Sequence, residues 1–259
     1  MLTKPQLSRI AQRHQIGLAT VERDYVQVMF LYLLYTRTQD LILKGGTCLR
    51  IVYRSNRYSE DLDFNGRGSV ESVRQILQQT TRDLARFGVQ ATAINEWVSQ
   101  HGYAFHLSFK GPLANHRVTT WSGIDIDVSL REDDWVVTPV RSFLNASTWG
   151  YDDIPAFTLS HLSRSDIFAE KVRAFFERKQ PAPRDLYDLW LLLETGETVN
   201  IDLINQRMAR LQRTFEYGDF AKLVAVLRNG WEQDLKHLLP SLPPFVQVSQ
   251  AVLERFEQR

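Results

Sequence analysis

With 259 residues and 44% hydrophobic content, the chain can bury a good core and is long enough for one large domain or two small ones. The formal net charge is only +1, which excludes a strongly basic nucleic-acid-binding protein, so any contact with RNA must come from local patches. The single cysteine, Cys48, cannot form an internal disulfide and the N-terminus has no signal-peptide pattern, so we expect a cytoplasmic protein with no membrane partner.

The predicted elements alternate between helices and strands in the first part of the chain. A helical lead-in extends through about residue 39, and its apolar run at 26–35 is too short and too interrupted to cross a membrane. A strand and helix at 41–53, an acidic strand at 58–64 and a helix at 70–87 follow. Segments that alternate apolar and polar residues are predicted strands, at 89–97, 103–109, 124–130 and 135–140.

The second part of the chain has a different pattern. From about residue 159 it is mostly helical, and the composition changes at 150–155. We therefore predict an α/β (α+β) fold, with a mixed β-sheet flanked by helices in residues 1–155. Residues 156–259 are predicted to form a helical domain that completes the active-site cleft.

Two adjacent glycines, Gly45 and Gly46, follow the first predicted strand and its last residue, Lys44. Glycine adopts backbone conformations closed to other residues and lets amide N–H groups approach a ligand. The helix expected to begin near Thr47 would direct its unpaired amide donors at the same place, so residues 44–47 are a candidate phosphate-binding turn. An ordinary strand-to-helix turn is the alternative.

The acidic strand carries Asp61 and Asp63, with Leu62 and Phe64 between and after them. Alternate residues of a strand point to the same side, so the two carboxylates would face one direction while the apolar residues face the core. Close carboxylates repel each other, and a divalent cation such as Mg²⁺ removes that repulsion. A solvated polar edge without a metal is the alternative.

A third carboxylate comes from the alternating segment 123–130. Asp125 and Asp127 would share its polar face, and if this strand lies beside the one with Asp61 and Asp63, one of its acids can reach the same ions. Asp127 is the first choice and Asp125 the second. The alternative is that both face solvent, with Arg131 nearby for pairing.

These motifs together resemble the nucleotidyltransferase superfamily, whose pattern is Gly-Gly or Gly-Ser, a spacer, Asp-x-Asp and a later carboxylate. Within it the chain resembles the AbiEii or MenT-like family, the abortive-infection toxins of type IV-like toxin–antitoxin systems, which carry Lys-Gly-Gly-Thr and Ser-Glu-Asp-x-Asp. Segments 169–178 and 184–189 resemble that family's third and fourth motifs. The four motifs occur in the family's order and cover about residues 40 to 190.

The resemblance implies a toxin that transfers a nucleoside monophosphate from an NTP to an RNA acceptor, the tRNA 3′ end, and so inhibits translation. It implies Mg²⁺ or Mn²⁺ on Asp61, Asp63 and Asp127, an NTP as substrate and a cognate antitoxin as partner. Two other functions stay open: a phosphotransferase (kinase) acting on a protein or small molecule, and a catalytically inactive nucleotide-binding module.

Lys171 and Arg178 lie seven residues apart in an amphipathic helical pattern, which predicts that they share one helix face. Lys171 would contact the triphosphate, and Arg178 or Arg184 would bind a pair of oxygens. By the resemblance Lys171 and Asp185 are catalytic together with the Asp-x-Asp pair, with Asp188 as the alternative to Asp185. From the residues alone, Lys171 on a solvated helix face and Asp185 as an acid favoured at a helix N-terminus are the alternatives.

Ser59 lies two residues before Asp61 and, in a strand, would face the bound nucleotide. The family often carries Ser or Thr here, phosphorylated in some members, so the resemblance makes Ser59 a nucleotide-binding residue and a regulatory phosphorylation candidate. A local hydrogen-bonding role is the alternative. Candidate RNA contacts, or else a solvated face, are Arg50, Arg54 and Arg57, and downstream Arg164, Lys171, Arg173, Arg178, Lys179 and Arg184.

Overall fold

The computed structural model describes residues 1–114, 121–131 and 139–258. The chain divides into two compact units, Met1–Leu162 and Ser163–Arg259. The first contains a mixed β-sheet with helices and the second is helical in its described residues, so the predicted α/β class is confirmed. The sheet's last strand in sequence, β7 (Phe157–His161), belongs to the first unit, whereas the sequence-predicted boundary lies before it.

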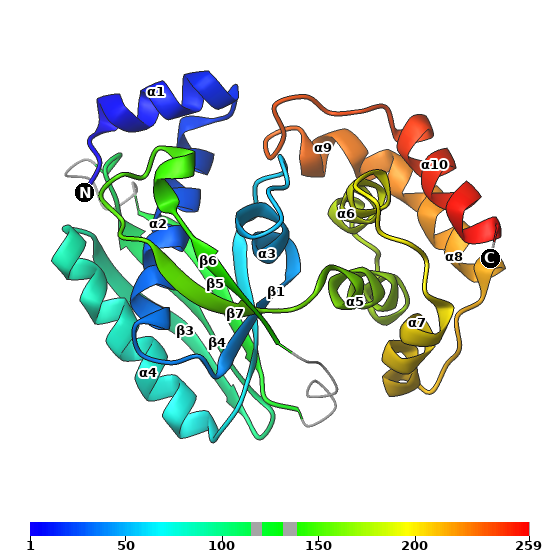
Figure 1. Ribbon diagram of the computed structural model, residues 1–259, viewed down its shortest axis with the longest axis horizontal. Helices are drawn as coiled ribbons and strands as arrows, with labels where there is room; N and C mark the ends of the chain where they lie inside the picture. The colour runs from blue at the N-terminus through cyan, green and yellow to red at the C-terminus, as the bar shows by residue number, and fades with distance from the viewer. Residues whose placement is uncertain (115–120, 132–138, 259) are drawn as a thin grey trace. The chain divides into compact units, whose positions relative to one another are not determined.

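A mixed sheet forms the centre of the first unit (Figure 1). Its described strands follow the order β3-β4-β5-β2-β1-β7-β6. The β2/β5 and β1/β7 pairs are parallel, and the other neighbours are antiparallel. The remaining strands are β1 (Leu41–Lys44), β2 (Asp61–Gly66), β3 (Gln90–Ser99), β4 (Gly102–Lys110), β5 (Ser122–Ser129) and β6 (Val140–Leu144).

Helices α2 and α4 cover one face of this sheet (Figure 1). The side chain of Ser69 accepts a hydrogen bond from the amide of Ser72 at 3.2 Å and so caps α4. Apolar residues of α4 at helical spacing, Val73 and Leu77, are buried. Among its described residues, the helices of this unit are α1 (Lys4–His14), α2 (Leu18–Tyr35), α3 (Gly45–Ile51) and α4 (Val70–Asp83), with 3₁₀ turns at Leu84–Phe87 and Ala146–Trp149.

Strand β7 was not predicted, because the chain was expected to be mostly helical from residue 159. It has only five residues, and Phe157, Leu159, Ser160 and His161 are all buried. A short, largely buried segment lacks the alternation that identifies a strand. The predicted strand at 135–140 lies outside the described residues except at its end, where β6 begins with Val140.

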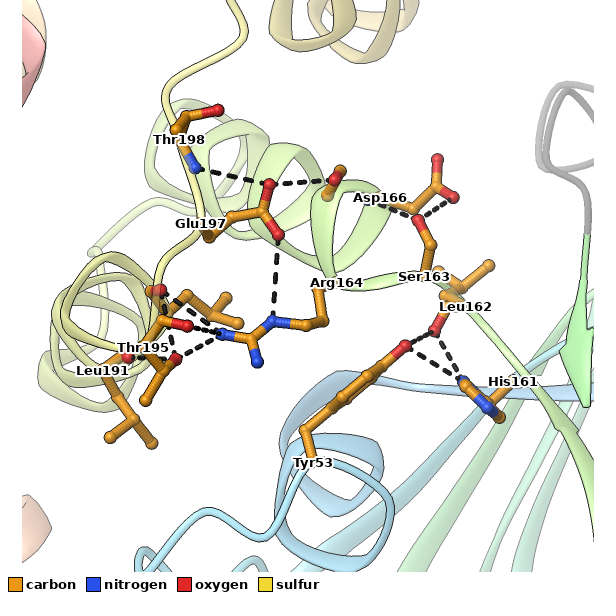
Figure 2. Close-up of polar contacts among 12 residues, drawn as sticks. Tyr53, His161, Leu162, Ser163, Arg164, Asp166, Leu191, Thr195, Glu197 and Thr198 are labelled. Carbon is orange, nitrogen blue, oxygen red and sulfur yellow. Dashed lines mark hydrogen bonds and ion pairs between the residues drawn. The ribbon is translucent and has the colours of Figure 1, made fainter. Parts of the chain in front are cut away.

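His161 joins β7 to its surroundings through both ring nitrogens. Its Nδ1 lies 2.8 Å from the carbonyl oxygen of Leu162, which also accepts a hydrogen bond from the Tyr53 hydroxyl at 2.9 Å (Figure 2). Nδ1 must donate to that carbonyl, so the neutral ring can accept at Nε2 from the Ser142 hydroxyl, 2.8 Å away on β6. Burial lowers the pKa of His161 and favours this neutral form.

The second unit packs its helices around an aromatic core. The Phe220 ring lies 4.7 Å from Phe256, 5.1 Å from Phe175 and 5.7 Å from Phe215 between centroids. Such ring pairs each contribute about 0.5–1.5 kcal/mol beyond the area that they bury. The helices are α5 (Arg164–Glu177), α6 (Pro183–Glu194), α7 (Ile201–Met208), α8 (Tyr217–Ala225), α9 (Trp231–Leu235) and α10 (Phe245–Glu257), with 3₁₀ turns at Ala209–Leu211 and Val226–Gly230. Within the described ranges, no helix is both long and apolar enough to cross a membrane.

Candidate active site

The two acidic strands are neighbours in the sheet. β2 and β5 run parallel, with Asp61 opposite Asp125 and Asp63 opposite Asp127. Residues paired in this way point to the same side of a sheet, so all four carboxylates lie on one face. The intervening residues Leu62, Phe64, Ile124, Ile126 and Val128 are at most 1% exposed. Burial of these apolar residues on the opposite face fixes the register and keeps the carboxylates on the open face.

An open cavity of about 470 Å³ lies over this face. It is lined by the four aspartates and by residues of the next two strands, Asn95 on β3 and Ala104, Phe105 and His106 on β4. Sequence reasoning missed Asn95 and His106. An isolated asparagine and an isolated histidine carry no sequence signal of a site, and their placement depends on how β3 and β4 pair with β5.

The surroundings of Asp125 and Asp127 differ. The Asp125 carboxylate Oδ1 lies 2.7 Å from His106 Nδ1, and its side chain is 73% exposed. Asp127 has Asp63 opposite it on β2 and the small Ala104 opposite it on β4. The register neighbour on β4 is therefore His106 for Asp125 and the small Ala104 for Asp127. Asp127 is the register partner of Asp63, and Asp125 is the register partner of Asp61.

The glycine turn lies directly beside the carboxylates. Gly45 has φ +70°, and a Cβ on this residue would lie 2.6 Å from Asp63 Oδ2. Helix α3 begins at Gly45, two residues earlier than expected. The Thr47 hydroxyl donates to the carbonyl oxygen of Asp61 and so ties the turn to β2, while Lys44 is the antiparallel partner of Asp63 on the same face. Only a glycine lets the turn approach Asp63 this closely.

Ser59 and Arg57 line the other side of the turn. A Cβ on Gly46 would lie 2.8 Å from Ser59 Oγ, and the Arg57 guanidinium is also in contact with this position. Both side chains are buried, at 7% and 2% exposed. Strand β2 begins only at Asp61, so the expectation that Ser59 lies within the strand is wrong, but its hydroxyl does lie at the glycine turn.

Two of the three upstream arginines expected at an RNA-binding surface are interior residues. Arg57 Nη1 donates to the carbonyl oxygen of Tyr58 at 2.9 Å. Arg50 forms an ion pair with Asp24 at 3.2 Å, and its guanidinium lies 4.0 Å from the centre of the Tyr58 ring. Arginines buried in this way are not available to RNA. Arg54 is exposed.

In the second unit, Lys171 and Arg178 of the α5 region converge on Asp185 of α6. The Lys171 ammonium lies 2.7 Å from Asp185 Oδ1 and 2.8 Å from Asp188 Oδ2. Arg178 Nη1 contacts the other oxygen of Asp185. Lys171 is 8% exposed and the two aspartates at most 1%. The interpretation of Lys171 as a residue on a solvated helix face therefore does not fit. Asp185 does lie in the first turn of α6, as an acid favoured at a helix N-terminus would, but it is also buried and paired with both cations.

Several other downstream cations are also paired with acids or carbonyls. Arg173 contacts Glu170 at 2.6 Å and also Glu177. The Arg164 guanidinium donates to the carbonyl oxygen of Thr195 at 3.2 Å and lies 3.8 Å from Glu197 (Figure 2). A cationic surface in this unit must therefore be smaller than the sequence predicts. Lys179 is exposed and Arg184 is partly exposed.

Comparisons with known proteins agree with the resemblance seen in the motifs. A family model described as nucleotidyl transferase AbiEii toxin, type IV toxin–antitoxin system, matches residues 30–258. The nucleotidyltransferase toxin MenT4 from Mycobacterium tuberculosis is similar in structure, with a TM-score of 0.71 and 19% identity over 99% of this chain and 89% of that one. JHP933 from Helicobacter pylori gives a TM-score of 0.63 and 17% identity over 94% of this chain and 92% of that one. Among curated proteins none matches.

The family model spans nearly the whole chain, including the glycine turn, both acidic strands and the helices with Lys171 and Asp185. The solved structures share less than 25% identity with the chain and support the fold. The chain belongs to the AbiEii nucleotidyltransferase toxin family of type IV toxin–antitoxin systems.

Proposed function

We propose that the protein transfers a nucleoside monophosphate from an NTP to an RNA acceptor, the 3′ end of tRNA, and so inhibits translation in the cytoplasm. The observation that carries this activity is the parallel pairing of β2 and β5, which brings Asp61, Asp63 and Asp127 to one face beside the glycine turn. Membership of a toxin family supports nucleotidyl transfer and a cognate antitoxin as partner. The RNA acceptor rests on the motif resemblance.

The residues of this face suit a divalent metal. Asp61, Asp63 and Asp127 offer only hard oxygen ligands in an open cavity. Among the described residues, no three or more His, Cys, Asp or Glu side chains lie close enough together to form a metal-binding group by themselves. Mg²⁺ does not need one, because it commonly takes one or two carboxylates with water and substrate phosphates as the other ligands. When bound, Mg²⁺ or Mn²⁺ would lower the pKa of the acceptor hydroxyl and neutralise charge on the leaving pyrophosphate.

Residues of the chain itself would bind the triphosphate for the transfer step. The amides of residues 45–47 would bind the phosphates, and Asp63, which lies against Gly45, would then be next to them. The acceptor hydroxyl loses its proton, its oxygen bonds to the α-phosphorus, and the bond to the β-phosphate oxygen breaks so that pyrophosphate leaves. Lys44, on the same face as Asp63, would add a positive charge.

On the motif resemblance, we propose that Lys171 contacts the triphosphate and that Arg178 acts beside it. The 2.7 Å and 2.8 Å ion pairs with Asp185 and Asp188 hold the Lys171 ammonium in one position. We assign Asp185 to the positioning of Lys171, because Asp185 also contacts Arg178 and thus joins both cations. Asp188 would share this task.

Transfer of label tests this function. The purified protein is incubated with each NTP labelled at the α-phosphate, Mg²⁺ and total tRNA, and we expect label on RNA. Parallel reactions with γ-labelled NTP separate the alternative, because a phosphotransferase would pass on the γ label and a nucleotidyltransferase would release it in pyrophosphate. Absence of α label from RNA with all four NTPs would rule out the proposed reaction.

We predict that Ser59→Glu lowers transfer by at least about 10-fold. The Ser59 hydroxyl lies beside Gly46, where an added negative charge would repel the incoming phosphates, as a phosphate on this serine would do more strongly. Ser59→Ala, which adds neither charge nor bulk, is the matched control and should change transfer by less than about 3-fold. Full activity of Ser59→Glu in the labelled transfer assay would remove Ser59 as a regulatory site.

A further inference from the structure

An exposed tryptophan lies on the carboxylate face of the sheet. Trp97 of β3 is 57% exposed. It pairs with Ala104 of β4, and Ala104 pairs with Asp127 of β5. Register partners point to the same side, so the indole shares a face with the candidate catalytic acids and lies two strands, about 10 Å, from Asp127. An exposed aromatic ring on the same face as the candidate site offers a flat apolar surface to a ligand bound there.

A β-bulge next to this tryptophan directs a polar side chain into the cavity over the four aspartates. The register between β3 and β4 shifts between Ile94 and Trp97, and Asn95 has φ +53°. Asn95 lines the cavity with the four aspartates. The other bulge residue, Glu96, accepts hydrogen bonds from Tyr103 and from Arg74 of α4, both at 3.0 Å, which holds the bulge in place. Bulges beside active sites commonly redirect one side chain in this way.

The indole ring of Trp97 also packs against strand β4. Trp97 Cζ3 lies 3.5 Å from the position that a Cβ on Gly102 would occupy, so the ring lies against β4 where that strand has no side chain. The strand supports part of the ring and the rest remains open. A supported, partly open aromatic ring loses little conformational entropy when another flat group stacks on it.

We propose that Asn95 and Trp97 form a nucleobase-binding subsite, in which the indole stacks on the base and the Asn95 amide hydrogen-bonds to its edge. This assignment deepens the proposed function and rests on it. A flat, uncharged ligand fits the setting better than a phosphate, because the neighbouring charged groups in the cavity are carboxylates. An aromatic platform takes any base, and an amide offers both a donor and an acceptor.

The base could belong to the NTP or to the RNA acceptor, and binding measurements distinguish the two without any chemical step. One series titrates each NTP into the protein by calorimetry with Ca²⁺ in place of Mg²⁺. The other follows the anisotropy of a 5′-fluorescein single-stranded RNA of 12 nucleotides, either intact or with an abasic ribose at one of its last three positions. The variants are Trp97→Ala, Trp97→Phe and Asn95→Gly, the last of which keeps the left-handed backbone conformation.

Phe143→Ala is the matched control, because Phe143 is a 72% exposed aromatic residue on the opposite edge strand, β6. We expect Trp97→Ala to lower the affinity for one of the two ligands about 10-fold and Asn95→Gly to lower the affinity for the same ligand about 3-fold or more. Trp97→Phe and Phe143→Ala should change that affinity less than 3-fold. If that ligand is RNA, removal of the base at one position should weaken binding to the wild type as much as Trp97→Ala does. The same abasic RNA should bind Trp97→Ala no more weakly than the intact RNA does.

Changes below 2-fold for both ligands in Trp97→Ala and Asn95→Gly would overturn the subsite. A dimeric wild type that becomes monomeric as Trp97→Ala, measured by light scattering during size exclusion, would overturn it as well and assign Trp97 to a contact between copies of the chain. Failure of α-label transfer in the wild type is a separate result that bears on the proposed function, because these titrations do not depend on catalysis.

Discussion

Asp63→Asn is expected to lower nucleotidyl transfer by about 10³-fold while the protein remains folded. Asp63 is the carboxylate in contact with Gly45 and opposite Asp127, so its replacement removes a negative charge at the place where the glycine turn meets the acidic strands. Loss of one preorganised charged group at a reacting centre costs rate mainly in the transition state, so kcat should fall more than KM rises. Asparagine keeps the size of the side chain and the buried neighbours of β2.

Asp127→Asn and Asp125→Asn form a matched pair for the third acid. Asp127→Asn should lower transfer by about 10²-fold or more, and Asp125→Asn by less than about 10-fold, because Asp125 already pairs with His106 at 2.7 Å. Both positions are exposed on β5, so the thermal midpoints of the two variants should match that of the wild type. Transfer is measured with α-labelled NTP and tRNA. Equal activity of Asp63→Asn and wild type, or a larger loss for Asp125 than for Asp127, would contradict the site as assigned.

The face with the four carboxylates could be predicted only in part from the sequence. Alternation in segment 123–130 is enough to predict a strand with Asp125 and Asp127 on its polar side, and that strand is β5. The sequence does not reveal that β5 pairs with β2, because strand order depends on contacts between residues far apart in the chain. The choice between Asp125 and Asp127 likewise depends on His106, which β4 supplies.

Buried charges are where sequence patterns mislead most. Arginines usually lie on the surface, so a cluster at 50–57 predicts a cationic patch. Arg50 is instead paired with Asp24, which also accepts a hydrogen bond from Tyr151 at 2.6 Å. Asp24 and Tyr151 are both far from Arg50 in sequence. The bulge at Asn95 is hidden from the sequence for a similar reason, because an extra residue in one strand can be recognised only when the pairing with the neighbouring strand is known.

Lys171→Met is expected to lower the free energy of unfolding of the second unit by about 3–5 kcal/mol. Lys171 lies between Asp185 and Asp188, both at most 1% exposed, and methionine would leave two buried carboxylates without this cation. Removal of one partner from a buried ion pair costs this much because the remaining charge stays desolvated. Lys222→Met is the matched control: Lys222 pairs with Asp219 at 3.2 Å on an exposed helix face, and its loss should cost less than about 0.5 kcal/mol.

Hydrogen exchange of peptides from α5 and α6 measures this effect in the second unit alone, without requiring the whole chain to unfold in one step. The double variant Lys171→Met with Asp188→Asn should recover part of the loss, since one of the two buried charges is then neutral. Wild-type exchange in Lys171→Met would show that the ion pairs do not stabilise the helices. A variant that exchanges hydrogen at the wild-type rate but has lost transfer would show that Lys171 acts only on the triphosphate. If Lys171 both contacts phosphate and neutralises the two buried acids, its replacement must lower stability and activity together.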